Sequence, residues 1–301
     1  MEIKQFKGKK GLKVDELLYQ YKDLGHQAKK LGEAADIIVE MIKDKECKVF
    51  LGLAGALVPG GMRLILKDMI ERGWIDVFVT TGANMTHDLA EDLGHKHIYV
   101  DEKSDDKELN KKGLDRMYNT AMPNKVYEDI EDLFVKNWDE IEKCKDVKEF
   151  LWTIGKITPG DGILKTCYKK KIPIFCPAIS DSGIGLMVWG RIVDNKKINV
   201  NAFEDLKEIL DIAWTAKKTG VIYLGGGTPK NYIQQAMQFS KGASYGVQIT
   251  MDSAEWGGSS GAPLKEGISW GKLKYKANYV DVKCDVTIAL PLIYSALIDR
   301  I

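Results

Sequence analysis

The stretch Lys48–Gly61, KVFLGLAGALVPGG, joins an apolar run to a glycine-rich loop and introduces a pattern that recurs along the chain. The apolar residues are strand formers, and a helix is predicted from Arg63 to Glu71, after the loop. A strand, a glycine loop and a helix in this order can direct helix amides at an anionic group. The loop matches neither G-x-G-x-x-G nor G-x-x-x-x-G-K-[ST], so a simple tight turn explains it equally well.

The same arrangement occurs twice more. IDVFVTTGANMTHDLAEDLG, residues 75–94, predicts a strand over 76–80, the turn 81–84, and a short helix capped by Asn84 or Thr86. VIYLGGG, residues 221–227, runs into a triple glycine, and Thr228-Pro229 begins the next helix. Loops of this kind at the carboxyl ends of parallel strands are what a nucleotide crevice needs.

Helices alternate with these strands along the chain. Helices are predicted at 24–43, 127–143, 145–156, 162–170, 201–218 and 291–300, and further strands at 172–176, 244–250 and near 280–290. The charged segment 101–112 is predicted to be a surface loop. This order predicts an α/β fold, a single doubly wound, mostly parallel Rossmann-like sheet with helices on both faces. We found no linker or repeat, so we expect one domain over residues 1–301.

The composition of the chain indicates which partners, cellular compartment and metal sites to expect. The net charge of +1 provides no global basic field for nucleic acid or for an anionic membrane. No stretch approaches the ~20 apolar residues of a spanning helix, and the start, MEIKQFKGKK, has no apolar signal-peptide region. The five cysteines never form C-x-x-C, which indicates reduced thiols in a cytoplasmic protein. His95 and His97 have no third ligand at suitable spacing, so we expect hydrogen-bonded or solvent-facing imidazoles and no metal.

The stretch 252–274, DSAEWGGSSGAPLKEGISWGKLK, has the composition of an amine site. It combines two glycine-rich turns, two Trp residues, three carboxylates, and Lys272 two positions after Trp270. Aromatic faces and carboxylates suit a cationic substrate, and a lysine that loses its proton is a nucleophile. In an extended segment Trp270 and Lys272 would share one face. Sequence physics alone does not single out Lys272 among so many lysines.

One acid follows a predicted strand directly. Asp181 lies just beyond the strand 172–176, in IPIFCPAISDSGIG. An acid at this position of a doubly wound fold can accept hydrogen bonds from ribose hydroxyls. It can equally cap the turn through Ser182-Gly183.

Six segments together carry a family resemblance. They are FLGLAGALVPGG, VTTGANMTHDL, IPIFCPAISDSGIG, VIYLGGGTPKN, GAPLKEGISWGK and CDVTIALPL. Through them the chain resembles the deoxyhypusine synthase family over nearly its full length, and ISWGK is its most specific motif. The EWGG at 255–258 resembles the branch of deoxyhypusine-synthase-like proteins common in bacteria.

The resemblance implies roles for particular residues. Lys272 would be the family's covalent imine-forming lysine, and Trp270 and Glu266 would belong to the amine pocket. NAD would contact Gly55, Ala56, Leu57, Val58, Pro59, Thr81, Gly82, Ala83, Asp181, Gly227 and Asp285. No metal is expected.

The resemblance also implies a reaction. NAD would take a hydride from spermidine, and the resulting imine would pass its four-carbon fragment to the lysine with release of 1,3-diaminopropane. The fragment would then move to an acceptor lysine on the translation factor 5A precursor and be reduced by the retained NADH. A homotetramer is implied as well. The chain departs from the family at Leu186, Tyr232 and Ser259, where an Asp, a His and an Asp usually hold the polyamine. Glu255 or Asp252 could supply the missing charge.

Three functional hypotheses follow. The first is aminobutyl transfer to a protein lysine, of the deoxyhypusine synthase type. The second is a small-molecule polyamine transferase on the same scaffold, for example a homospermidine synthase that uses putrescine. The third, a nucleotide-binding protein without transferase activity, is disfavoured because Lys272, Trp270 and Glu266 are all present.

Overall fold

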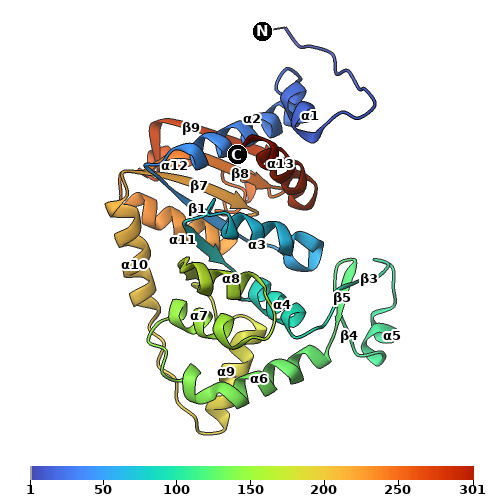
Figure 1. Ribbon diagram of the computed structural model, residues 1–301, viewed down its shortest axis with the longest axis vertical. Coiled ribbons are helices and arrows are strands. Elements are labelled where there is room, and N and C mark those ends of the chain that lie inside the picture. Colours follow the sequence, from blue (N-terminus) through green and yellow to red (C-terminus); the bar gives the residue numbers. More distant parts are fainter. Residues whose placement is uncertain (1) are drawn as a thin grey trace. The chain divides into compact units, whose positions relative to one another are not determined.

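The computed structural model describes residues 2–301, and its contacts divide them into two compact units (Figure 1). Unit 1 contains the described residues up to Ala54 together with Trp74–Val79 and Lys207–Ile301. Unit 2 contains Gly55–Gly73 and Thr80–Leu206. The expectation of one domain over the whole chain stays a prediction.

The main sheet has six strands in the order β6-β2-β1-β7-β8-β9. Their bounds are β6 Ile174–Phe175, β2 Val77–Thr80, β1 Cys47–Leu53, β7 Lys218–Leu224, β8 Ala243–Thr250 and β9 Leu273–Lys283. The pairs β1–β7, β7–β8 and β8–β9 are all parallel. The α/β fold with a mostly parallel sheet is therefore confirmed.

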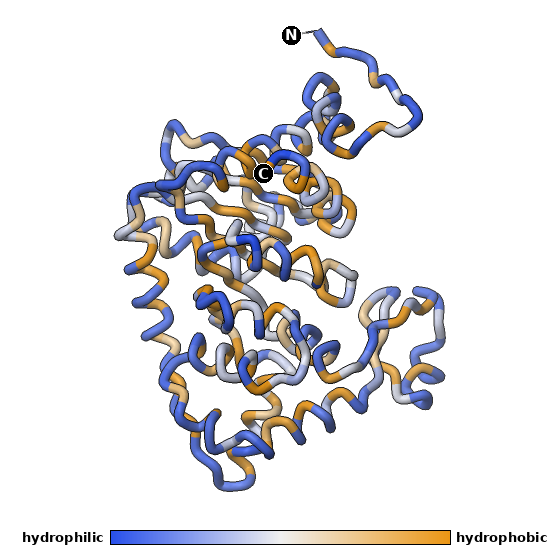
Figure 2. The backbone as a smooth tube through the Cα atoms, viewed as in Figure 1, coloured by the Kyte–Doolittle hydropathy of each residue, from blue (hydrophilic) through white to orange (hydrophobic). Residues whose placement is uncertain are grey.

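Unit 1 has helices on both faces of this sheet. Cys47 of β1 and Gly220 of β7 face α2 (His26–Lys43), because a Cβ on Gly220 would lie 2.4 Å from Met41. Gly52 of β1 is an odd number of residues from Cys47, so it points to the opposite face of the sheet. That face carries α11 (Gly227–Gln238), where a Cβ on Gly52 would lie 3.1 Å from Ile233. Figure 2 shows the hydrophobic residues gathered along these strands, whose side chains are buried on both faces.

Three strands of unit 1 end together at one edge of the sheet. The N–H of Ala54, just after β1, donates to Leu224 O at the end of β7. The N–H of Gly225 in turn donates to Ile249 O of β8. The glycine turn 225–227 and the stretch that begins at Asp252 therefore leave the sheet side by side, as the parallel arrangement requires.

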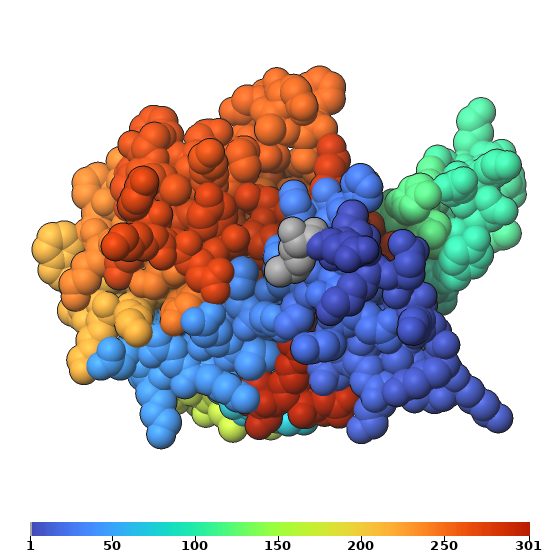
Figure 3. Space-filling view, turned by 90° about the horizontal axis from the view of Figure 1, so that it is seen from above, coloured from blue at the N-terminus to red at the C-terminus, as the bar shows by residue number. Residues whose placement is uncertain are grey.

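The remaining elements of unit 1 surround this sheet. They are α1 Val14–Tyr21, the 3₁₀ turn η2 Ala254–Trp256, α12 Glu266–Ser269, α13 Val286–Arg300 and the part of α10 (Ala202–Thr215) that begins at Lys207. Arg300 of α13 forms ion pairs with Asp15 of α1 and Asp36 of α2. The N-terminal segment and the C-terminal helix therefore lie side by side on one face of this unit (Figure 3).

Unit 2 is mainly helical and includes a small antiparallel sheet in the order β3-β5-β4. Its helices are α3 Arg63–Glu71, α4 Gly82–Asp92, α5 Asp106–Lys111, α6 Lys125–Ile141, α7 Val147–Ile157, α8 Ile163–Lys170 and α9 Gly183–Val193. A π-helical turn, η1 Val58–Met62, precedes α3, and the small strands are β3 Ile98–Tyr99, β4 Leu114–Met117 and β5 Thr120–Pro123.

Some local predictions were wrong. The strand predicted near 280–290 ends early, because β9 ends at Lys283 and α13 already begins at Val286, before the predicted helix 291–300. Segment 101–112 is not wholly loop, because Asp105 caps the short helix α5 by accepting from Lys107 N. Helix α4 begins at Gly82, earlier than predicted, and neither Asn84 nor Thr86 is its cap. Thr81 caps it instead, because its Oγ1 accepts from the N–H of Asn84 at 3.3 Å.

The structure also bears on two expectations, that no helix spans a membrane and that the cysteines are reduced. Between residues 2 and 301, no helix has both the length and the apolar character needed to cross a bilayer. All five cysteines are free thiols, and four of them are buried.

Candidate functional site

Lys272 and Trp270 form the centre of the predicted amine site in unit 1. The Lys272 ammonium lies 4.8 Å from the centroid of the Trp270 ring. The predicted pairing is confirmed, but its geometry differs from an extended segment. Gly271 between them has φ +71°, in the left-handed region, so a turn after α12 brings the ammonium back over the indole. Trp270 remains 57% exposed, so its ring can still face a ligand.

A buried lysine that the sequence analysis did not identify anchors the neighbouring loop. Lys230 of α11 is 1% exposed, and its Nζ donates to Ser259 O at 2.5 Å and to Ala262 O at 2.6 Å. Gln248 of β8 donates to the same Ala262 carbonyl at 3.1 Å. The segment that carries Ser259 is thus held against α11, the helix that also carries Tyr232.

Charges from the predicted site surround Lys230. Burial lowers the pKa of Lys230 to about 8, while Asp281 and Glu266 oppose this change and Lys272 adds to it. The pKa of the Asp281 carboxyl is raised by burial, against the Leu264 N–H and Lys230. Asp281 accepts from Leu264 N at 3.0 and 3.2 Å, and so fixes the start of the segment that leads to Glu266.

The glycine turn 225–227 packs directly on this anchored segment. The N–H of Gly227 donates to Ser260 Oγ at 2.7 Å. A Cβ on Gly226 would lie 2.4 Å from Ser260 Cα, so only glycine permits this approach. The structure therefore brings Gly227, a predicted cofactor contact, next to the predicted amine-site residue Ser259.

Three other predicted residues of unit 1 are exposed. Glu255 lies in η2, and Glu266 begins α12 close enough to affect the pKa of Lys230. Asp285 caps α13, where its carboxylate accepts from Thr287 N at 2.7 Å and from the Thr287 hydroxyl at 2.5 Å. Part of the Asp285 carboxylate is thus already used in capping.

In unit 2, the loop Gly55–Pro59 exposes backbone donors. Gly55 has φ +79° and open space where a Cβ would lie. The N–H groups of Gly55, Ala56 and Leu57 donate to no acceptor among residues 2–301, whereas the N–H of Val58 donates to Asn84 Oδ1 at 3.2 Å. Consecutive free N–H groups beside a left-handed glycine form a concavity suited to an anion.

The turns at Thr81 and Asp181 also meet in unit 2. A Cβ on Gly82 would lie 2.5 Å from Ser182 Cβ, so the turn 81–83 packs tightly on the start of α9. Ser182 caps α9 by accepting from Gly185 N at 3.1 Å, which shows that Asp181 is not the cap. The Asp181 carboxylate is exposed and has no hydrogen-bond partner in the described part of the chain, so it is free to accept from a ligand.

These groups fit a dinucleotide chemically. Free N–H groups at 55–57 suit a phosphate, and a free carboxylate at Asp181 suits ribose hydroxyls. The predicted contacts form two groups, one in unit 2 (55–59, 81–83 and 181) and one in unit 1 (227 and 285). Within unit 2, contacts of Asn84 and Gly82 bring the loop 55–59, the turn 81–83 and the segment 181–182 together.

Three histidines of unit 2 use their ring nitrogens in hydrogen bonds to other side chains of the protein. His97 Nε2 lies 3.0 Å from His87 Nδ1, and His97 Nδ1 lies 2.9 Å from Glu91 Oε1. His95 Nε2 lies 2.7 Å from Asp129 Oδ2. The expected hydrogen-bonded imidazoles are confirmed. Among residues 2–301, no group of three or more His, Cys, Asp or Glu side chains is arranged so that it could hold a metal ion.

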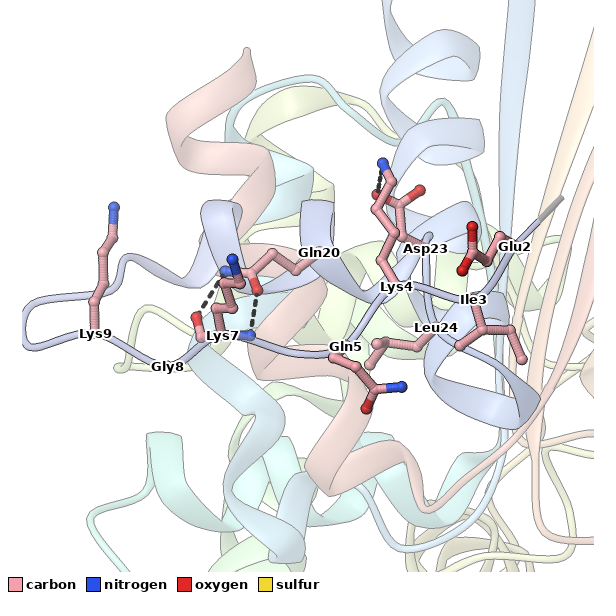
Figure 4. A pocket seen from close by; sticks show the side chains of 10 residues that line it. All are labelled: Glu2, Ile3, Lys4, Gln5, Lys7, Gly8, Lys9, Gln20, Asp23 and Leu24. Atoms are coloured by element: carbon pink, nitrogen blue, oxygen red, sulfur yellow. Dashed lines mark hydrogen bonds and ion pairs between the residues drawn. The ribbon is translucent and has the colours of Figure 1, made fainter.

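A separate cavity of about 870 Å³ lies between the N-terminal segment and α1 (Figure 4). Lys4 pairs with Asp23 at 2.7 Å, and the backbone of Lys7 exchanges two hydrogen bonds with the Gln20 amide. No predicted site residue lines it. The cavity is therefore distinct from the amine site at Lys272.

Sequence reasoning missed Lys230, Asp281, Gln248 and Asn84. Lys230 follows the motif GGGTP, but the chain has 44 Lys and Arg residues, and nothing local marks this one as buried. Asn84 was one of two candidate helix caps, with Thr86, whereas its side chain contacts residues 26 and 29 positions earlier. Only the folded structure shows these contacts.

Comparisons with known proteins identify the family of the chain. The family model "Deoxyhypusine synthase" matches residues 16–297. The chain is 41% identical over 292 residues to "Probable deoxyhypusine synthase 1" of Archaeoglobus fulgidus, which covers 97% of this chain and 96% of that protein. It is also 41% identical to "Probable deoxyhypusine synthase 1" of Methanosarcina acetivorans, over 96% of this chain and 92% of that protein.

Solved structures show the same fold. A putative deoxyhypusine synthase from Entamoeba histolytica superposes with a TM-score of 0.65 at 20% identity, over 98% of this chain and 96% of that one. The ternary complex of AgrE with ornithine and NAD+ superposes with a TM-score of 0.58 at 12% identity, over 91% of this chain and 34% of that one.

The fold is that of an α/β protein, and in unit 1 the segment that carries the Lys272–Trp270 pair also packs on the glycine turn 225–227 after β7. With the matches above, the chain belongs to the deoxyhypusine synthase family. The family indicates an enzyme, a transferase.

Proposed function

We propose that the protein is an NAD-dependent aminobutyltransferase, which moves a four-carbon amine fragment from spermidine to a lysine of the translation factor 5A precursor. The observation that carries this proposal is the Lys272 ammonium 4.8 Å from the Trp270 ring, within the family's ISWGK motif. A lysine beside an open aromatic face can hold and attack a cationic substrate. We further propose that the enzyme is a cytoplasmic homotetramer.

Each residue of the proposed site would have a separate role in binding the substrate or in catalysis. Trp270 would bind the substrate cation, and Glu266, Glu255 and the neighbouring Asp252 would balance its charge. Lys272 would take the four-carbon fragment as an imine from the oxidised amine, with release of 1,3-diaminopropane, and the acceptor lysine would then displace Lys272 from that imine. NAD, when bound, would accept a hydride from the amine and return it in the final reduction.

The two groups of predicted contacts support NAD as the cofactor. Backbone donors at 55–57 and the Asp181 carboxylate have the chemistry that phosphates and ribose require. The AgrE complex shows that another protein with this fold holds NAD+. The carboxylate of Asp285 would reach a ligand only through the part that is not used in capping α13.

A second candidate is favoured by three specific residues. Leu186 is 53% exposed, and neither it nor Ser259 and Tyr232 can supply the carboxylates and imidazole usual in the family. Fewer anionic partners would weaken recognition of a multiply charged amine. The same chemistry with a small amine as acceptor, as in homospermidine synthesis from putrescine, is therefore the alternative.

Trapping and transfer experiments together test the proposal. The protein is incubated with NAD and labelled spermidine and treated with borohydride, and tryptic peptides are then mapped. The fragment should be attached to Lys272, and Lys272→Arg, which keeps the positive charge, should show no adduct. An adduct on another lysine, or none with the wild type, would refute the mechanism.

The acceptor is identified by competition. Labelled spermidine and NAD are supplied with either the factor 5A precursor or putrescine. Label in the precursor protein supports the first function. Label that appears only in the small amine selects the alternative.

A further inference from the structure

Asn84 joins two loops that lie about 25 residues apart in the sequence. Its side chain is 0% exposed, in the first turn of α4. The Nδ2 group donates to Gly55 O at 2.8 Å and to Thr81 Oγ1 at 3.0 Å. The Oδ1 atom accepts from the N–H of Val58 at 3.2 Å. One amide therefore satisfies polar groups from both the loop 55–59 and the turn at Thr81.

These bonds fix the orientation of the amide. If the amide were flipped, its oxygen would face the Gly55 carbonyl and its NH₂ would face the Val58 N–H. Both contacts would then be repulsive, so only the observed orientation is consistent with the site. Because the side chain is fully buried, water cannot replace a bond that is lost.

The loop 55–57 has few other restraints. Ala56 and Leu57 use their carbonyls to accept from Gly60 and Met62, within the same loop and turn. Among residues 2–301, Asn84 is the side chain that hydrogen-bonds to the backbone at Gly55 and Val58. The N–H groups of 55–57 have no acceptor among the described residues.

Asn84 also sets the hydrogen bonding of Thr81. The Thr81 hydroxyl oxygen accepts from both the N–H and the Nδ2 of Asn84. Its two lone pairs are then used, so the hydroxyl proton is left as a donor for another group. The Thr81 hydroxyl thereby adds a side-chain donor to the backbone N–H donors of 55–57.

We propose that Asn84 is the positioning residue of the cofactor site. It holds the loop 55–59 against the turn 81–83, so that their free donors converge on one anionic group, the phosphate of a dinucleotide. The residue itself is buried and contacts no ligand. This inference rests on the proposed use of NAD.

The test compares NAD binding to the full-length wild type, Asn84→Leu and Asn84→Asp. Leucine keeps the volume and removes all three bonds of the side chain, whereas aspartate keeps the acceptor for Val58 and loses the donor to Gly55. We expect both variants to bind NAD at least about tenfold more weakly by calorimetry, with the KM for NAD raised and the KM for spermidine unchanged. A residue with only a general structural role would not separate the two KM values.

Asn137→Asp is the matched control. Asn137 of α6 also donates from Nδ2 to a backbone carbonyl, that of Leu133 at 2.7 Å, but it contacts no predicted cofactor loop. We expect this variant to bind NAD as the wild type does.

A measurement on the wild type avoids dependence on folding of the variants. In the ligand-free protein, the amide of Val58 should exchange slowly with solvent because it donates to the buried Asn84, whereas the amides of 55–57 should exchange quickly. Fast exchange at Val58, or wild-type affinity in Asn84→Leu, would overturn the role of Asn84 and leave the proposed function intact. If the wild type binds no NAD, the proposed function fails, and the inference fails with it.

Discussion

Two lysines of the predicted amine site and its surroundings, Lys272 and Lys230, lie in opposite environments. The Lys272 ammonium lies beside an exposed tryptophan, where a substrate can reach it. Lys230 is 1% exposed and its ammonium is engaged by two carbonyls, so it cannot reach a substrate without breaking the loop 259–262. The lower pKa of Lys230 would by itself suggest a nucleophile, but its geometry identifies a structural anchor.

This assignment predicts a pH dependence of stability. The pKa of Lys230 is about 8 in the folded protein and near 10.5 when unfolded, so the folded state binds fewer protons between these values. The free energy of unfolding should therefore increase by up to ~3 kcal/mol as pH rises from 8 to 10.5, so the protein becomes more stable. Urea unfolding across this range measures the gain.

Lys230→Met should abolish this rise because the titrating group is gone. It should also increase protease cleavage at 259–262, since the Ser259 and Ala262 carbonyls lose their donor. Lys241→Met, at an exposed lysine that also donates to a carbonyl, should behave as the wild type. An unchanged pH slope in Lys230→Met would show that Lys230 is not the titrating group.

At the level of elements, the site depends on close approaches between turns. Gly226 and Ser260 come from turns after β7 and β8, and they meet without room for a side chain. Gly258 lies in the same stretch of chain but has open space around it and no left-handed φ. The two glycines therefore form a natural pair for comparison.

Gly226→Ala should destabilise the protein by about 1–3 kcal/mol, because the new Cβ would overlap Ser260 and displace the anchored segment. The transferase activity should fall with it. Gly258→Ala should change the unfolding free energy by less than about 1 kcal/mol. Urea denaturation and initial rates measured for both variants decide this point, and equal effects would rule out the proposed packing.

Helix α4 carries a second pH-sensitive group, His87, which lies against His97 beside β3. Burial, with a smaller contribution from His97, lowers the pKa of His87 to about 4 from an ordinary 6.5. The folded state therefore binds fewer protons than the unfolded state between pH 4 and 6.5. Stability should fall as pH drops through this window, by up to ~3 kcal/mol, and level off below it.

His87→Asn should flatten this decline, because the amide can hydrogen-bond in place of Nδ1 but does not titrate. His26→Asn, at an exposed histidine, should keep the wild-type pH profile. Thermal unfolding between pH 4 and 7 provides the measurement. If the profile of His87→Asn still falls as steeply as that of the wild type, His87 is not responsible.

At the scale of the whole molecule, the sequence predicted what depends on local pattern. Strands that end in glycine loops, such as KVFLGLAG, were identified because their chemistry lies within a few residues. The pairing of Lys272 with Trp270 was predicted for the same reason, although the turn at Gly271 was not.

What the sequence did not reveal depends on distant contacts. Asn84 hydrogen-bonds to Gly55, Lys230 to Ala262, and His87 to His97. The partners in these bonds are between 10 and 32 positions apart in the sequence. Each is a common residue type in an unremarkable local context, and its role arises only from tertiary packing. The division into two compact units was likewise absent from local composition.

The last prediction concerns assembly. Helix α9 of unit 2 is apolar along most of its length, and four of its hydrophobic side chains are more than half exposed: Leu186, Trp189, Ile192 and Val193. Exposed apolar residues at helical spacing are typical of an interface between subunits. In the proposed homotetramer, this surface should be buried.

Trp189→Lys should therefore weaken association by roughly 100-fold, since an interfacial tryptophan commonly contributes a few kcal/mol. Light scattering after gel filtration should show a tetramer for the wild type and a smaller species for Trp189→Lys at micromolar concentration. Leu64→Lys is the control, because Leu64 of α3 is 70% exposed, comparable to Trp189 at 64%, but is not on the α9 surface. A wild-type monomer would contradict the proposed tetramer, and a Trp189→Lys tetramer would place the interface elsewhere.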